Sequence, residues 1–258
     1  MKNLLFFLLL VLASCTKEKQ ADWKLLWSDE FDKPGLPSDS NWGNEVGFIR
    51  NHELQYYTDK RIENSVVQDG KLMIIGRKEQ WIAGKDTAAF TSASINTDGK
   101  HAWTYGKIEA SMKLPKGQGL WPAFWMLGQN IHEVGWPKCG EIDIMEHINN
   151  LDVSHGTLHW HNEKHVSSGA TTPNDVTKFH VYSVEWDADS IKWFMDGKQY
   201  HQVCIKDGVN STEEFHKPHY LILNFAIGGD WPKNPDETTL FPDTVYVDYV
   251  RVYQNSQK

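Results

Sequence analysis

The residues best suited to chemistry lie together in one short segment, 140–147, which reads Gly-Glu-Ile-Asp-Ile-Met-Glu-His. Three carboxylates, at Glu141, Asp143 and Glu146, fall within six residues. On a helix, the first and last of them would diverge by about 140° around the axis. On a strand, Glu141 and Asp143 share one face, and the isoleucines between them point into a core. A β-bulge at Met145 would return Glu146 to the face of the other two acids.

Three acids on one face of a strand repel one another, and adjacent like charges destabilise a strand with a purely structural role. Their proximity also raises the pKa of at least one carboxyl. One ionised carboxylate beside one protonated carboxylic acid is the pair that cleavage of a glycosidic bond requires. A solvated acidic edge strand or a calcium site would use the same residue types, but Ile142 and Ile144 favour a strand buried on its other face.

Short alternating segments separated by turn residues predict the elements that must position these acids. Asp-Gly turns at 69–70 and 196–197 predict two hairpins. The mostly apolar run 220–227 suits a strand covered on both faces. One late strand, 244–253, is expected to have five side chains on one face: Val245, Val247, Tyr249, Arg251 and Tyr253. Long helical periodicity is absent, so we predict an all-β sandwich of two antiparallel sheets.

Composition limits the classes of protein to which the chain can belong. The 258 residues include 26 Lys and Arg against 34 Asp and Glu, a formal charge of −8 that argues against a nucleic-acid partner. Hydrophobic residues make up 40%, which is enough for a core and excludes disorder. Twelve Trp residues supply rings that stack on sugars, although a Trp-rich core would use them equally well. With only Cys139 and Cys204 in the body of the chain, no disulfide scaffold is expected, and their pairing stays open.

The N-terminal segment has the pattern of a secretion signal. A positive start is followed by a ten-residue apolar run that ends at Ala13 and is too short to span a bilayer as a stable helix. Small residues then precede Cys15, as in the bacterial lipobox, where the cysteine is lipidated. We predict a lipoprotein signal peptide over 1–14, a lipidated Cys15, a tether over 15–21 and one domain over 22–255. An ordinary signal with a chance cysteine is the alternative.

Motifs along the chain resemble glycoside hydrolase family 16. The segment 141–146 resembles the active-site signature of that family, and further segments match its pattern in order over nearly the whole mature chain: 27–31, 53–57, 105–109, 119–127, 155–159, 228–232 and 247–253. The resemblance implies a concanavalin-like β-jelly roll with a cleft on its concave sheet. It also implies a retaining double displacement without a cofactor, in which Glu141 is the nucleophile and Glu146 the acid and then the base. Asp143 would hydrogen-bond the nucleophile.

The extra residue Met145 is typical of family members with a bulged signature, which include laminarinases, agarases and carrageenases. The segments 121–127 and 228–232 resemble laminarinases most. This implies an endo-acting β-1,3-glucanase, with mixed-linkage β-1,3-1,4-glucan as a second substrate. Two alternatives stay open: a hydrolase of agar or carrageenan on the same fold, and a carbohydrate-binding lipoprotein without catalysis. The intact acid set weighs against the second alternative, because binding alone does not need three adjacent acids.

Four tryptophans are candidates for contact with sugar. Trp136 precedes the first acid by five residues, and Trp231 lies in one of the family segments, so we predict both as stacking platforms. Trp121 and Trp125 also lie in a family segment, but a place in the core would explain them equally well.

Polar contacts to sugar are expected from three further residues. Arg77, at the end of a predicted strand, resembles a family arginine that hydrogen-bonds sugar hydroxyls, although an ordinary strand-end charge is the alternative. Asn51 resembles a second contact, but Asn-His-Glu over 51–53 departs from the usual Asn-Asn-Glu. His159 is expected to face the cleft and to contact Asp143 or the sugar, unless it is a core histidine. It belongs to a histidine-rich stretch over 155–165 whose spacing resembles no known zinc site.

The resemblance further implies a structural calcium site on the convex side. Its oxygen ligands would be Glu30, the carbonyl of Gly70 and Asp248. Ordinary hydrogen bonds of the two carboxylates are the alternative. The expected partners are a β-glucan and, through the lipid on Cys15, a bacterial outer membrane or cell surface, with the protein itself a monomer.

Overall fold

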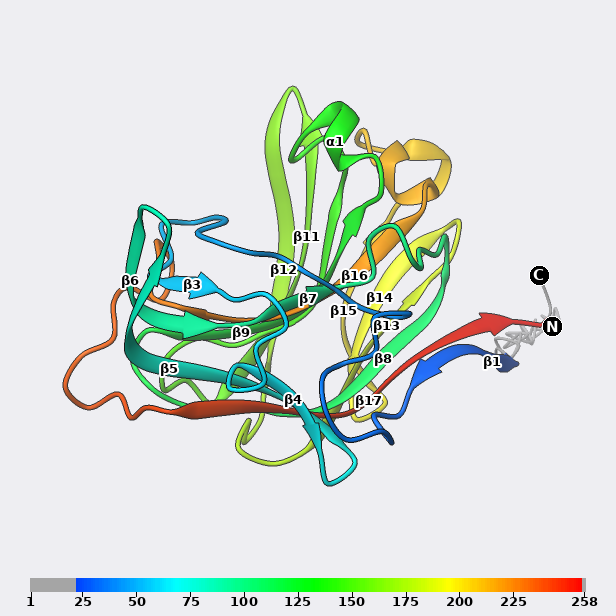
Figure 1. Cartoon of the computed structure of the whole chain (residues 1–258). Coiled ribbons are helices and arrows are strands. Elements are labelled where there is room, and N and C mark those ends of the chain that lie inside the picture. The colour runs from blue at the N-terminus through cyan, green and yellow to red at the C-terminus, as the bar shows by residue number, and fades with distance from the viewer. Residues whose placement is uncertain (1–21, 257–258) are drawn as a thin grey trace, which may run out of the picture.

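Nearly all regular structure in the computed structural model, which describes residues 22–256, is β-strand (Figure 1). In this range the helical segments are short: α1 (Ile131–Val134), η1 (Lys206–Gly208) and η2 (Glu213–His216). No helix within 22–256 is long and apolar enough to cross a membrane. The predicted signal peptide 1–14, the lipidation site Cys15 and the tether 15–21 lie outside the described residues.

The larger of two sheets has ten strands. Its main path is, in order, β15 (Lys198–Cys204), β14 (Ser190–Met195), β13 (His180–Trp186), β8 (Gly106–Lys113), β17 (Asp243–Asn255), β5 (Lys71–Ala83), β6 (Asp86–Ser92) and β3 (Gln55–Tyr57). Two more strands pair with this path: β1 (Trp23–Asp29) with β17 and β4 (Ser65–Gln68) with β5. The pairing of β1 with β17 brings the two ends of the described chain to one side of the molecule (Figure 1).

The smaller sheet has seven strands and carries the three acids. Its order is β12 (Lys164–Pro173), β11 (Val153–Asn162), β10 (Glu141–Glu146), β9 (Leu120–Gly128), β16 (His219–Ile227), β7 (Ser94–Asn96) and β2 (Gly43–Asn44). Two facing sheets of this kind confirm the predicted jelly-roll sandwich.

One strand pair corrects the expectation of purely antiparallel sheets. β3 runs parallel to β6. The physical reason is the long connection between them, which contains β4 and β5; a crossover of that length allows parallel pairing, whereas a tight hairpin does not.

Both predicted hairpins are present. β4 and β5 join at Asp69-Gly70, and β14 and β15 join at Asp196-Gly197. All four turn residues have positive φ, the conformation that Asp-Gly hairpin turns require.

The prediction for the last strand is wrong in one respect. The register of β17 against β8 shifts between Val247 and Tyr249, so the period of two is broken at Asp248. The buried set is therefore Val245 and Val247 followed by Val250 and Val252. Tyr249, Arg251 and Tyr253 lie on the other face, because a bulge moves every later side chain to the opposite side.

The main hydrophobic core lies between the two sheets, and a second apolar cluster lies on the other face of the smaller sheet. On β9, Phe124 and Met126 belong to the main core. The alternate residues Ala123, Trp125 and Leu127 belong to the second cluster, as strand alternation requires. That second face, crossed by β9, β10 and β16, is the floor on which the candidate site is built.

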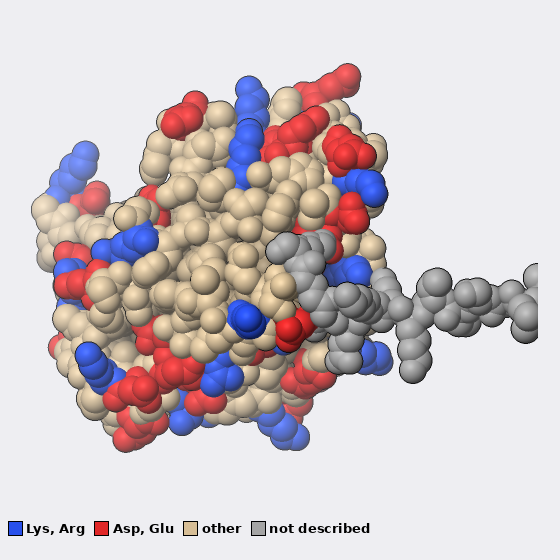
Figure 2. Space-filling view, turned by 90° about the vertical axis from the view of Figure 1, so that its right-hand side faces the viewer, with Lys and Arg blue, Asp and Glu red and all other residues tan. Residues whose placement is uncertain are grey.

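The surface around the chain termini carries charges of both signs. Figure 2 shows acidic and basic side chains interspersed around a largely uncharged centre. The net charge of −8 is therefore not gathered into one patch on this face.

Candidate active site

The bulge expected in the acid strand is present. The register of β10 shifts between Asp143 and Met145 against β9, and between Asp143 and Glu146 against β11. Ile144 and Met145 are both fully buried in the main core, although neighbouring residues of a regular strand point to opposite faces. The extra residue therefore returns Glu146 to the side of Glu141 and Asp143.

Two local features fix the position of the acid strand: a hydrogen bond from the opposite sheet and a glycine that precedes the strand. The fully buried indole of Trp193, on β14 of the opposite sheet, donates a hydrogen bond of 2.7 Å to the carbonyl of Asp143. This bond meets the backbone where the bulge interrupts the regular ladder. Gly140 precedes the strand with a φ of 77°, and a Cβ there would lie 2.9 Å from the ring of Phe215. Only glycine allows the chain to enter β10 at this angle.

The three acids open into a cleft of about 510 Å³ on the outer face of the smaller sheet. Its walls come from the segment 45–53, from β9, β10 and β16, and from the region of α1. The lining residues are Glu45, Ile49, Arg50, Asn51, Glu53, Trp121, Ala123, Trp125, Leu127, Ile131, His132, Trp136, Glu141, Asp143, Glu146, Tyr220 and Asn224. A concave site with a few convergent polar groups on an apolar floor has the form expected for small-molecule or sugar binding.

Indole N–H groups serve both outer acids. Trp136 donates to Oε2 of Glu141 at 2.9 Å, and Trp121 donates to Oε1 of Glu146 at 3.0 Å. A hydrogen-bond donor favours the ionised form of a carboxyl and fixes its orientation.

Burial raises the pKa of all three acids, and the charges of neighbouring carboxylates raise it further at Glu141 and Glu146. The pKa of Glu141 is raised to about 8, chiefly by burial and then by the charge of Asp143. Burial also raises the pKa of Asp143, and it raises that of Glu146 well above the ordinary range, with the charges of Asp143 and Glu141 adding to the effect. The side chain of Glu141 keeps 17% of its exposure, whereas that of Asp143 keeps 3%. The cluster therefore holds protons at neutral pH, and Glu141 is the best placed of the three to ionise.

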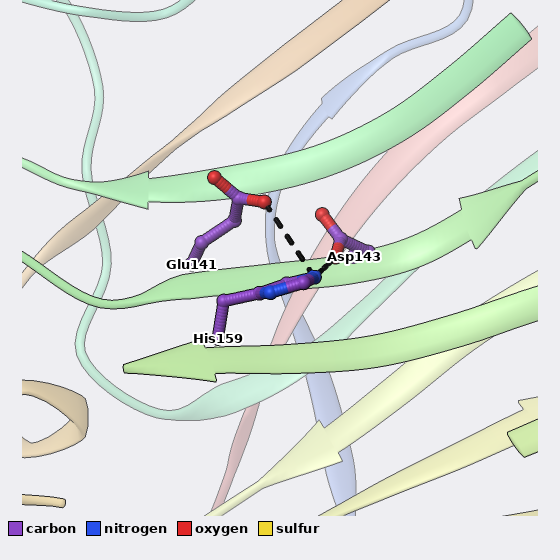
Figure 3. A group of neighbouring side chains, drawn as sticks. All are labelled: Glu141, Asp143 and His159. Carbon is purple, nitrogen blue, oxygen red and sulfur yellow. Dashed lines mark ion pairs between the residues drawn. The ribbon is translucent and has the colours of Figure 1, made fainter. Parts of the chain in front are cut away.

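His159 reaches from β11 towards the first two acids, and Figure 3 shows its ring between them. Its Nε2 lies 3.1 Å from Oδ2 of Asp143 and 4.0 Å from Oε1 of Glu141. Its Nδ1 lies 2.8 Å from Nε2 of His165, and the two rings stack. Partial desolvation, and then the neighbouring His159 ring, lower the pKa of His165. The contact expected between His159 and Asp143 is therefore present, and a role in binding sugar stays a prediction.

The tryptophans divide into exposed and buried rings. Trp136 and Trp231 are 49% and 39% exposed, as a stacking platform requires. Trp231 meets Trp121 edge to face, with ring centroids 5.4 Å apart, at one end of the acid row. Trp125 is buried in the floor, where its indole donates to Asn224 at 2.8 Å.

Of the two remaining residues predicted as polar contacts to sugar, Asn51 lines the cleft and Arg77 does not. Asn51 lines the cleft and donates to Glu53 at 3.2 Å. Arg77 is not among the lining residues; it lies on β5 opposite Thr91 of β6, with its Nε 3.9 Å from Oε1 of Glu79. Its contact with sugar stays a prediction.

Sequence reasoning missed the arginine that does line the cleft. Arg50 lies 5.0 Å above the ring of Trp125 and pairs with Glu45. A second missed group, Asn224, joins Trp125 to the hydroxyl of Tyr57, to which its amide donates at 3.0 Å. The adjacent Asn51 was the only local signal for this wall.

The residues predicted for calcium face cations of the protein itself. Glu30 accepts hydrogen bonds of 2.9 and 2.8 Å from the guanidinium of Arg251, and these bonds lower its pKa. An oxygen of Asp248 lies 3.9 Å from the ammonium of Lys71. The calcium site expected at Glu30, Gly70 and Asp248 stays a prediction.

The two cysteines of the described chain are free thiols. Cys139 is buried in the second apolar cluster, and Cys204 is exposed at the end of β15. Burial raises the pKa of the Cys139 thiol to about 12.

Comparison with known proteins agrees with this geometry. Clotting factor G alpha subunit of Tachypleus tridentatus is 42% identical over 247 residues, which cover 94% of this chain and 35% of that protein. A β-glucanase of Rhodothermus marinus is 41% identical over 270 residues, which cover 96% of this chain and 93% of that protein. The catalytic domain of an endo-1,3-β-glucanase (laminarinase) from Thermotoga petrophila RKU-1 superposes with a TM-score of 0.83 at 43% identity, over 92% of this chain and 100% of that one. The family described as glycosyl hydrolases family 16 matches residues 39–251, and the chain therefore belongs to this family of glycoside hydrolases.

Proposed function

We propose that the protein is an endo-acting, retaining β-1,3-glucanase that also cleaves mixed-linkage β-1,3-1,4-glucan. The observation that carries the proposal is the bulged strand β10, which delivers Glu141, Asp143 and Glu146 to one cleft. The likeness to a β-glucanase and to an endo-1,3-β-glucanase supports the choice of substrate. An open cleft on a sheet face suits an enzyme that binds a polymer along its length and cuts within it.

In the proposed mechanism the ionised carboxylate of Glu141 attacks the anomeric carbon. Glu146 donates its proton to the glycosidic oxygen, so that the carbon–oxygen bond to the leaving sugar breaks as the glycosyl ester to Glu141 forms. Glu146 then takes a proton from water, which attacks the same carbon and releases Glu141. The stereochemistry is retained because two inversions occur at one carbon.

Electrostatics support this division of roles. Glu141 keeps more exposure than Asp143, accepts the N–H of Trp136 and lies near His159, all of which favour its ionised form. Glu146 is the more deeply buried of the two outer acids and faces two carboxyls, which favours its protonated form. Asp143 lies between the two outer acids. It is proposed to position the nucleophile and to share a proton with the neighbouring carboxyls.

The exposed rings would supply binding without charge, as a neutral glucan requires. Trp136 and Trp231 are proposed as platforms on either side of the acid row. Asn51 and Trp121, which line the cleft, are proposed as further contacts, and Trp125 as the floor beneath them.

The test is the release of reducing ends from a panel of laminarin, curdlan, barley glucan, lichenan, agarose and carrageenan. Wild type is compared with Glu141→Ser and with Glu237→Gln. Glu237 is an exposed acid that does not line the cleft, so this variant serves as the control. We expect short oligomers from laminarin, with activity lost in Glu141→Ser and kept in the control. Release from agarose or carrageenan alone would overturn the substrate, and binding of laminarin without any release would overturn catalysis.

We further propose that the mature chain is a monomer held by a lipid on Cys15 at a bacterial outer membrane or cell surface. The apolar run followed by small residues and a cysteine supports this proposal. Cys15→Ser should move the protein from the membrane fraction to the soluble fraction and abolish labelling by palmitate. Light scattering of detergent-free Cys15→Ser should give the mass of one chain. A calcium ion held by Glu30, Gly70 and Asp248 stays a prediction, and a chelator that leaves the thermal midpoint unchanged would contradict it.

A further inference from the structure

We propose that the acid cluster is also a binding site for one divalent transition-metal cation of the Zn²⁺ class, held by Glu141, Asp143 and His159. The site itself follows from the geometry alone, and only its consequence for catalysis depends on the proposed function.

The three ligand atoms already have nearly the spacing that a tetrahedral ion needs. One oxygen of each carboxyl and a ring nitrogen of His159 all lie within 4.8 Å of one another. Metal–ligand distances of 2.0–2.2 Å place two tetrahedral ligands about 3.3 Å apart. Nε2 of His159 is 3.1 Å from Oδ2 of Asp143 and 4.0 Å from Oε1 of Glu141, so the Glu141 carboxyl must move towards the other two ligands to complete the site.

The second nitrogen of His159 sets the tautomer that a metal requires. Nδ1 lies 2.8 Å from Nε2 of His165. When Nδ1 carries the proton and donates it to His165, the lone pair of Nε2 is directed towards the two acids (Figure 3). A ligating histidine that donates its other N–H to a neighbour is the usual arrangement around protein-bound zinc. The Trp136 indole holds the far oxygen of Glu141 in the same way.

A buried oxygen without a hydrogen bond points into this site. The side chain of Asp143 is 3% exposed, and within 22–256 its Oδ2 accepts no hydrogen bond of good geometry, although Nε2 of His159 lies 3.1 Å from it. The neighbouring Glu141 and Glu146 repel it when they ionise. A divalent cation would satisfy that oxygen and replace repulsion between carboxylates by attraction to a shared charge. One nitrogen with two carboxylate oxygens suits Zn²⁺ or Co²⁺ better than Ca²⁺, which prefers oxygen ligands throughout.

The cation would compete with catalysis, because Glu141 cannot attack a sugar while it ligates a metal. Two of the three ligands, Glu141 and Asp143, line the cleft in which the sugar would bind. Bound oligosaccharide and bound cation should therefore exclude each other.

The test is metal binding to the chain carrying Cys204→Ser and no polyhistidine tag. The Cys204→Ser substitution removes an exposed thiol that would otherwise bind metal itself. Calorimetry with Zn²⁺ should give one cation per chain, and Co²⁺ should give the visible absorption of a low-coordinate nitrogen–oxygen site. His159→Ala should abolish saturable binding, and His165→Ala should weaken it about 10–100-fold through the lost orientation of His159.

His180→Ala is the matched control, because this histidine lies on β13 of the larger sheet, does not line the cleft and is expected to leave the affinity unchanged. Circular dichroism checks each fold, and Asp143→Asn replaces His159→Ala if that variant does not fold. The proposal is overturned if no saturable binding occurs, or if saturable binding survives in His159→Ala. These measurements contain no substrate, so a failure of the glucanase proposal would leave them unchanged. Inhibition of laminarin cleavage by Zn²⁺ at the same concentration that saturates the calorimetric site is expected separately.

Discussion

Burial of the acid cluster predicts that Glu141→Gln stabilises the protein increasingly as the pH rises. The pKa of Glu141 is raised from an ordinary 4.5 to about 8, first by burial and then by the charge of Asp143. A carboxyl with a higher pKa in the folded state binds its proton more tightly when folded. Stability is therefore complete below the unfolded pKa of 4.5 and is lost as the pH rises through about 8. A glutamine at position 141 makes a contribution to stability that does not change with pH, because its amide does not titrate.

The size of the effect follows from the two pKa values. At about 1.36 kcal/mol per pKa unit, the carboxyl costs about 1 kcal/mol at pH 5 and about 5 kcal/mol at pH 9. This is an upper limit, because Asp143 and Glu146 share the same repulsion and ionise more easily when Glu141 is neutral. Taking half of the difference, the advantage of Glu141→Gln should grow by about 2 kcal/mol between pH 5 and pH 9. For a chain of this length that corresponds to about 4–8 °C in Tm.

The assay is thermal and urea unfolding at constant ionic strength from pH 5 to pH 9. Glu237→Gln, at an exposed position, should run parallel to wild type. The change with pH is the measured quantity, so a uniform offset from the altered hydrogen bond with Trp136 does not affect the result. A stability difference that stays constant, or that shrinks towards pH 9, would refute the argument that burial holds the proton on Glu141.

Three further predictions concern the surroundings of the acids. Trp121→Phe removes the N–H that lowers the pKa of Glu146, so the alkaline limb of the kcat/KM profile should move up by about one pH unit; no shift, or a downward one, would contradict the acid role. Trp231→Ala should raise KM for laminarin about 5–10-fold with kcat little changed, which initial rates would show. Gly128→Ala would place a Cβ 2.0 Å from the carbonyl oxygen of Cys139 and should lower stability by about 2 kcal/mol or more in urea unfolding; a neutral result would mean that the strand end shifts freely.

Much of the fold was predictable because its signals are local. The turns at 69–70 and 196–197 need only an Asp-Gly pair between alternating segments. The bulge in β10 was predictable because three acids in six residues fit one face only if one residue is extra. By contrast, the bulge at Asp248 carries no such functional signal in the sequence, and the simple period of two gave the wrong face for three residues.

The parts of the site that could not be predicted depend on contacts between distant segments. The place of Arg50 above Trp125 depends on how the segment 45–53 folds over β9. The partner of Trp125, Asn224, lies 99 residues away along the chain, and no local pattern connects them. Arg77 shows the opposite case, in which a charge at the right place in the sequence lies on a strand that does not line the cleft.

The bulge also explains how the sandwich accommodates acids that work against its stability. Glu141 alone costs up to about 5 kcal/mol at pH 9, and the other two acids add to that repulsion. On its other face the same strand buries Ile142, Ile144 and Met145 completely. At about 1.5–3 kcal/mol for each buried side chain, these three contribute about 5–9 kcal/mol and offset the cost. A regular strand would turn only one of the two residues Ile144 and Met145 inward, so the residue that brings Glu146 to the cleft also adds the core side chain that keeps the strand in place.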